Sequence, residues 1–117
     1  MKYNLPEFHL LRNKLKPNSK INIVSESMEP WIKSGQTIEI SPTTLNELKP
    51  FDNIVYWEEK RQVLVCHIFL GIKDGFIICR PLATKERDLP INPNFLFGKV
   101  VSPSFKWYHK ALLRFIY

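Results

Sequence analysis

Most of this 117-residue chain is divided into short β-type runs separated by turn residues, and this division restricts the fold more than any other feature. The runs cover residues 21–24, 37–40, 53–57, 62–70, 76–80 and 95–101. The longer helix-compatible patterns occur near the two ends, residues 45–49 suit a single helical turn, and the length suits one domain with a modest core. Many short strands with little helix predict an all-β fold made of coiled antiparallel sheets or a barrel-like sheet, with short terminal helices.

Three regions follow from this pattern. Residues 1–20 form a basic N-terminal segment, in which apolar residues from Leu5 to Lys16 mark one face of a short helix that ends before Pro17. Residues 21–104 form the β domain. Residues 105–117 mix basic and aromatic side chains, which is typical of a helix docked on the domain or of a tail that lies in a membrane interface.

The formal net charge of +6 favours an anionic partner such as a membrane surface, a nucleic acid or an acidic peptide, unless it only keeps a small domain soluble. No run reaches 18 apolar residues, and the first 18 residues lack the apolar centre of a signal peptide. These features predict a cytoplasmic protein, with peripheral membrane association as a second possibility.

The two cysteines, Cys66 and Cys79, lie in runs joined by an Asp74-Gly75 turn. A hairpin about that turn pairs Cys79 with Leu70, so the two thiols are not cross-strand partners. We therefore expect buried free cysteines and a reducing compartment. The Cys and His spacings match no zinc pattern, and no Gly-rich loop indicates a nucleotide, so neither a metal nor a cofactor is predicted.

The residues that indicate chemistry lie between positions 25 and 35, in the order Ser-Glu-Ser-Met-Glu-Pro-Trp-Ile-Lys-Ser-Gly. A serine hydroxyl becomes a nucleophile only when a base removes its proton. His9 and His109 stand in the terminal basic segments, where a surface position is the default. His67 stands among apolar residues of a strand, which suits either a structural histidine or a base.

The Ser-x-Ser-Met-x-Pro order, with a Gly five residues after the Pro, resembles the nucleophile box of the signal peptidase family of serine proteases. The resemblance spans about residues 21–101 and implies the coiled β-sheet fold that this family shares with LexA-like proteins. In its archaeal and endoplasmic-reticulum branch, a His about forty residues after the serine replaces the bacterial lysine base. His67 follows Ser27 by that interval, and no lysine shares its run, so the Ser-Lys version is disfavoured.

The resemblance also implies the remaining site residues. Asp88 precedes a Phe97-Gly98-Lys99-Val100-Val101 run, as the acid that orients the His does in relatives, with Glu86 as its rival and a solvated loop aspartate as the plain alternative. Ser25 would join the Ser27 backbone N–H in holding the oxyanion, unless it only bonds its local backbone. Met28 would pack beneath the site and contact substrate, and Trp31 would line the substrate groove or belong to the core.

Three positions depart from the family pattern: Gln36 and Leu82 stand where relatives have Asp, and Ile68 stands where relatives have Arg. The sequence therefore predicts a serine endopeptidase that cleaves a precursor, leader or signal-type peptide through Ser27, His67 and Asp88. The alternative is a catalytically inactive peptide-binding relative. A basic β-barrel that binds nucleic acid is a further alternative, but no nucleic-acid signature is present and we expect no such partner.

Overall fold

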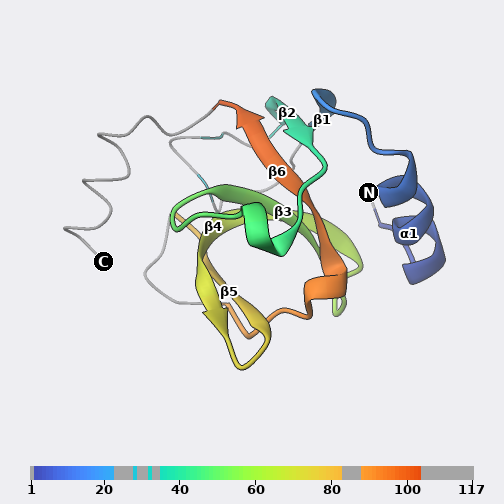
Figure 1. Ribbon diagram of the computed structural model, residues 1–117. Helices are drawn as coiled ribbons and strands as arrows, with labels where there is room; N and C mark the ends of the chain where they lie inside the picture. Colours follow the sequence, from blue (N-terminus) through green and yellow to red (C-terminus); the bar gives the residue numbers. More distant parts are fainter. Residues whose placement is uncertain (1, 23–27, 29–31, 33–34, 83–87, 104–117) are drawn as a thin grey trace.

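The computed structural model describes residues 2–22, 28, 32, 35–82 and 88–103 (Figure 1). One α-helix precedes six strands, and two short 3-10 helices lie in the connections. In chain order the elements are α1 (Leu5–Lys14), β1 (Ser19–Asn22), β2 (Thr37–Ser41), η1 (Leu45–Glu47), β3 (Asn53–Glu58), β4 (Val63–Lys73), β5 (Phe76–Arg80), η2 (Pro93–Phe95) and β6 (Leu96–Ser102).

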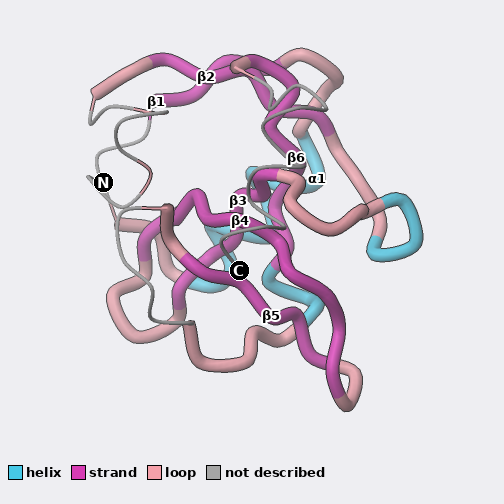
Figure 2. The backbone as a smooth tube through the Cα atoms, turned by 90° about the vertical axis from the view of Figure 1, so that its left-hand side faces the viewer, coloured by secondary structure: helices cyan, strands magenta, loops and turns pink. Residues whose placement is uncertain are grey.

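The six strands form one antiparallel sheet in the order β1-β2-β6-β3-β4-β5 (Figures 1 and 2). The predicted all-β class is therefore confirmed. β1 and β5 form the two edges, and β3 lies in the interior between β6 and β4. In the described part of the chain, no helix is long and apolar enough to cross a membrane.

The β4–β5 hairpin turns at Asp74 and Gly75, as the sequence predicts. Both residues have positive φ, 53° and 81°, which is the conformation of a type I′ turn that suits right-twisted strands. The expected pairing of Cys79 with Leu70 is wrong, because a bulge between Phe69 and Gly71 shifts the register and pairs Cys79 with Phe69. Cys66 and Cys79 are free and buried, as expected.

Helix α1 is joined firmly to the sheet. A capping box begins it, in which the Asn4 side chain accepts from the Glu7 N–H while the Glu7 carboxylate accepts from the Asn4 N–H. Phe8 has no exposed surface, and its ring stacks on Trp57 of β3 with 5.7 Å between centroids. The first twenty residues thus supply part of the core as well as the start of β1.

Two hydrophobic clusters lie on opposite faces of β3 and β4, because successive side chains of a strand point to opposite sides. The first contains Phe8, Val55, Trp57, Cys66 and Ile68 among its members. The second contains Ile54, Tyr56, Val65, Phe69 and Cys79 among its members. Alternation along β4 places His67 on the face of the second cluster, and this face carries the candidate site.

Candidate active site

His67 lies in the middle of β4 and pairs directly with Ile54 of β3. Its side chain is 8% exposed, and its neighbours at alternate positions of β4, Val65 and Phe69, belong to the second cluster. A buried imidazole needs a polar partner, since an unpaired polar group in an apolar setting is costly. The partner comes from a segment well beyond β5.

Asp88 supplies that partner. Its backbone N–H donates to the carbonyl of Cys79 at 2.9 Å, and Ile91 exchanges two backbone hydrogen bonds with Ile77, also at 2.9 Å. These bonds hold residues 88–91 along the outer edge of β5. The side chain of Asp88 is thereby directed back over β5 toward β4.

The carboxylate Oδ2 of Asp88 accepts a hydrogen bond from Nδ1 of His67. Among the described residues, every hydrogen bond of the His67 ring involves Nδ1. A carboxylate on Nδ1 selects the tautomer that carries its proton there, which leaves Nε2 as a basic nitrogen, and it stabilises the imidazolium that forms when Nε2 takes a proton. The structure therefore brings together two of the three residues that the resemblance assigns to catalysis.

Tyr56 of β3 is a third member of this cluster, and the sequence analysis did not single it out. Its hydroxyl donates to Oδ2 of Asp88 at 3.1 Å and lies 3.4 Å from Nδ1 of His67. Burial, followed by the charge of Asp88 and the hydrogen bond to it, raises the pKa of Tyr56 above its ordinary value near 10.0. The alternation of β3 and β4 was the available signal. In this hairpin Tyr56 pairs with Val65, and Val65 and His67 are alternate residues of β4, so Tyr56 and His67 lie on the same face.

The proposed nucleophile and its neighbours fall outside the part of the chain that the structure describes. Ser25, Ser27, Trp31 and the rival acid Glu86 are among these residues. Met28 is described, and its side chain is 1% exposed within the first hydrophobic cluster. Met28 therefore packs in the core, and the expectation that its side chain contacts substrate is corrected by this burial.

A second charged contact lies where the start of β3 meets β6. The Lys99 ammonium lies 3.4 Å from the carboxylate of Asp52, whose side chain is 2% exposed. The same carboxylate accepts from the Lys49 backbone N–H at 2.8 Å. Lys99 therefore offsets the charge of a buried carboxylate outside the His67–Asp88–Tyr56 set.

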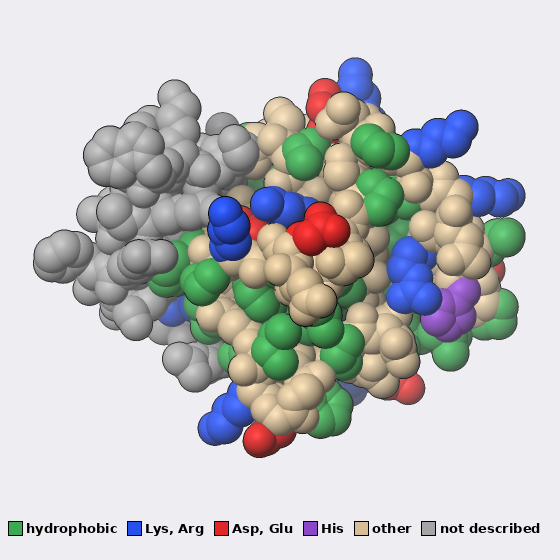
Figure 3. All heavy atoms as spheres, viewed as in Figure 1, with side chains coloured by type: hydrophobic (Ala, Val, Ile, Leu, Met, Phe, Trp, Pro, Cys, Tyr) green, Lys and Arg blue, Asp and Glu red, His purple; other side chains and the backbone are tan. Residues whose placement is uncertain are grey.

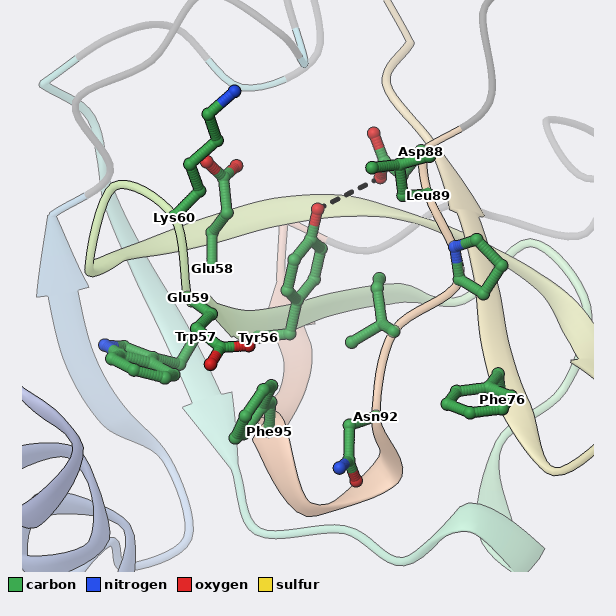
Figure 4. Close-up of a pocket in the computed structure, with 12 residues that line it drawn as sticks. Tyr56, Trp57, Glu58, Glu59, Lys60, Phe76, Asp88, Leu89, Asn92 and Phe95 are labelled. Atoms are coloured by element: carbon green, nitrogen blue, oxygen red, sulfur yellow. Dashed lines mark hydrogen bonds between the residues drawn. The ribbon is translucent and has the colours of Figure 1, made fainter.

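A groove of about 790 Å³ opens beside Tyr56 and Asp88 (Figure 4), and His67 is not among the residues that line it. Tyr56 and Asp88 line one end of it, with Glu58, Glu59 and Lys60 near them. The other walls are mostly apolar and are formed by Trp57, Phe76, Leu89, Pro90, Ile91, Asn92 and Phe95. Figure 4 shows the Tyr56 hydroxyl directed toward Asp88. The volume falls in the range of ordinary ligand sites.

Charge near the groove is partly compensated. Arg61 forms a salt bridge with Glu58, and this hydrogen-bonded contact is the main cause of the lowered pKa of Glu58.

Figure 3 shows hydrophobic side chains gathered over β5 and its turn, while Lys and Arg side chains project separately around this face. Leu89 and Phe76, which line the groove, are 87% and 45% exposed.

The other histidine that the structure describes, His9, lies on α1 and is hydrogen-bonded to Arg12 at 2.9 Å. Among the described residues, no group of three or more His, Cys, Asp or Glu side chains is arranged to hold a metal ion. The site thus consists of an acid, an imidazole and a phenol.

Comparison of the chain with family models, with curated proteins and with solved structures finds no match.

Proposed function

We propose that the protein is a serine endopeptidase that cleaves a precursor, leader or signal-type peptide. Ser27 is the nucleophile, His67 the general base and then the general acid, and Asp88 the residue that orients His67. The observation that supports this proposal is the buried His67–Asp88 pair, which joins two segments far apart in the chain and leaves Nε2 for a substrate-side partner.

The proposed reaction begins when His67 Nε2 takes the proton of the Ser27 hydroxyl as its oxygen attacks the peptide carbonyl. The Ser25 hydroxyl and the Ser27 backbone N–H stabilise the oxyanion. The imidazolium then donates its proton to the leaving amine, and an acyl-serine remains. Water, deprotonated by His67, releases the acyl group and restores the enzyme.

The groove supports a peptide as the substrate. Its apolar walls and its contact with Tyr56 and Asp88 fit side chains of an extended peptide that passes the site. The net charge of +6 supports an anionic partner such as a membrane surface. We propose that the protein acts in the cytoplasm or peripherally at such a surface.

Intact-mass spectrometry after incubation with a serine-directed, peptide-like acylating probe tests the proposal. We expect one adduct on the wild-type protein and none on Ser27→Ala or His67→Ala. Ser102→Ala and His9→Ala are the matched controls and should keep the adduct, because these residues lie outside the cluster. Circular dichroism must show that all variants are folded. An adduct that survives Ser27→Ala would refute the proposed nucleophile.

A catalytically inactive peptide-binding protein is the second candidate. Leu82 stands where the family pattern has a carboxylate, and it packs against the first hydrophobic cluster, so no second acid comes from that position. This candidate predicts that a folded wild-type protein gives no adduct yet binds a precursor peptide, as measured by fluorescence anisotropy.

A further inference from the structure

Tyr56 connects an interior strand of the sheet to the carboxylate of a loop. β3 pairs with β4 on one side and with β6 on the other, and Tyr56 lies opposite Val65 and Leu96 in these ladders. Asp88, in contrast, lies outside the strands. Its backbone N–H bonds to Cys79, and its side chain is 18% exposed. A donor on β3 is therefore well placed to fix the position of this carboxylate.

Both donors in the cluster reach the same oxygen. Oδ2 of Asp88 accepts from the Tyr56 hydroxyl and from Nδ1 of His67. A carboxylate oxygen has two lone pairs, so it accepts both hydrogen bonds at once. The Tyr56 ring also stands edge-on to the imidazole, with 5.8 Å between the ring centroids.

We propose that Tyr56 is a positioning residue that holds Asp88 against Nδ1 of His67 and thereby fixes the tautomer of the imidazole. The catalytic consequence rests on the proposed function, whereas the effect on the tautomer does not. Tyr56 acts through Asp88 and takes no part in bond making or breaking.

The protonation state of Tyr56 suits this role. Its raised pKa keeps the hydroxyl protonated, and therefore a donor, over the whole range in which an imidazole titrates. The charged and titratable groups that act on it include Asp88, Cys79 and Glu58. Only Asp88 of these three accepts its hydrogen bond.

Tyr56→Phe separates positioning from packing, because it keeps the ring in the cluster and removes only the donor. Nitrogen-15 NMR of the His67 ring is the first readout, with its signals assigned from His67→Ala. In the wild type we expect the neutral imidazole to carry its proton on Nδ1. In Tyr56→Phe we expect a mixture of the two tautomers, as in Asp88→Asn. Tyr3→Phe is the matched control and should keep the wild-type ring signals.

A double-mutant cycle is the second readout. Tyr56→Phe should slow acylation of Ser27 by the probe about tenfold, since it removes a hydrogen bond to a charged group. In the Asp88→Asn background, the same change should alter the rate by less than about twofold, because residues that act through one another are not additive.

The two readouts fail separately. An unchanged His67 tautomer in Tyr56→Phe overturns the inference, as does an equal loss of rate in both backgrounds. If the wild-type protein gives no adduct, the proposed function fails, and the tautomer measurement alone decides whether Tyr56 positions Asp88.

Discussion

Nδ1 of His67 and Oδ2 of Asp88 are hydrogen-bonded although 21 positions separate the two residues in the chain. The intervening β5 brings them together, because residues 88–91 bind its outer edge through backbone hydrogen bonds. The geometry of the pair therefore depends on the β4–β5 hairpin as well as on the two side chains.

The first prediction concerns Asp88→Asn. Asparagine has nearly the same shape, but it carries no charge to stabilise the imidazolium and can present an N–H to Nδ1. We expect acylation by the probe to slow by about 10²- to 10⁴-fold while the protein stays folded. Intact-mass spectrometry of samples quenched at a series of times measures the rate of acylation.

Asp74→Asn is the matched control, because Asp74 is exposed and asparagine adopts its positive φ readily. This control should acylate at the wild-type rate. A wild-type rate in Asp88→Asn would show that Asp88 does not orient the base.

The second prediction concerns stability at alkaline pH. Burial raises the pKa of Cys66 to about 12, and it also raises the pKa values of Cys79 and Tyr56. These groups keep their protons in the folded state at pH values where the unfolded chain has lost them. The free energy of unfolding is therefore fully retained below about pH 8 and falls as the pH rises further, by about 1.4 kcal/mol per pH unit for each such group once the pH exceeds its unfolded-state pKa.

Tyr56→Phe isolates the contribution of one group. Above about pH 10, the slope of unfolding free energy against pH should become shallower by about 1.4 kcal/mol per unit, because one fewer proton is involved. Between pH 6 and 8.5 the two proteins should differ by a constant amount. Urea unfolding at a series of pH values measures this, and equal slopes above pH 10 would contradict the prediction.

Local signals in the sequence predicted the fold well. The Asp74-Gly75 dipeptide located a hairpin turn, and the alternating runs located strands close to their observed bounds. The pairing of Cys79 was missed because a bulge after Phe69 adds one residue to β4. A glycine inside a strand often marks a bulge, so Gly71 was the available signal. The order of the strands in the sheet could not be predicted from local sequence patterns either, because β6 pairs between β2 and β3, which are distant from it in the chain.

The candidate site was predicted through the resemblance more than through the residues themselves. Strand pattern alone left His67 as either a structural histidine or a base, and only the order of motifs selected Asp88. Tyr56 was missed because an aromatic residue in a strand is usually read as core, and its hydroxyl gains meaning only once Asp88 is placed. The roles of Ser25, Ser27 and Trp31 remain predictions.

The third prediction concerns Gly98, in the run that resembles the end of the family's catalytic region. A Cβ at this position would lie 2.8 Å from the backbone oxygen of Ser41 and 3.2 Å from Cδ2 of Leu15. Backbone cannot move aside as a flexible side chain can, so Gly98→Ala should lower the free energy of unfolding by about 1–3 kcal/mol. Urea denaturation measures the loss.

Gly75→Asn is the control for Gly98→Ala. A Cβ at Gly75 meets no atom within 4 Å, and asparagine tolerates the positive φ of the turn. Its cost should stay below about 1 kcal/mol. A smaller loss for Gly98→Ala than for Gly75→Asn would mean that close approach of β2 and β6 does not explain the glycine.

The fourth prediction concerns the attachment of α1. Phe8 is fully buried and contacts the rings of Trp57 and Phe97, with centroids 5.7 and 5.9 Å away. Phe8→Ala leaves a cavity between helix and sheet and should lower the free energy of unfolding by about 3–5 kcal/mol. Leu10→Ala, at a position 56% exposed on the same helix, should change it by less than about 0.5 kcal/mol. Equal effects of the two changes in urea denaturation would mean that packing of α1 does not stabilise the β-sheet. The sheet, which carries the His67–Asp88 pair on its other face, would then be stable without the helix.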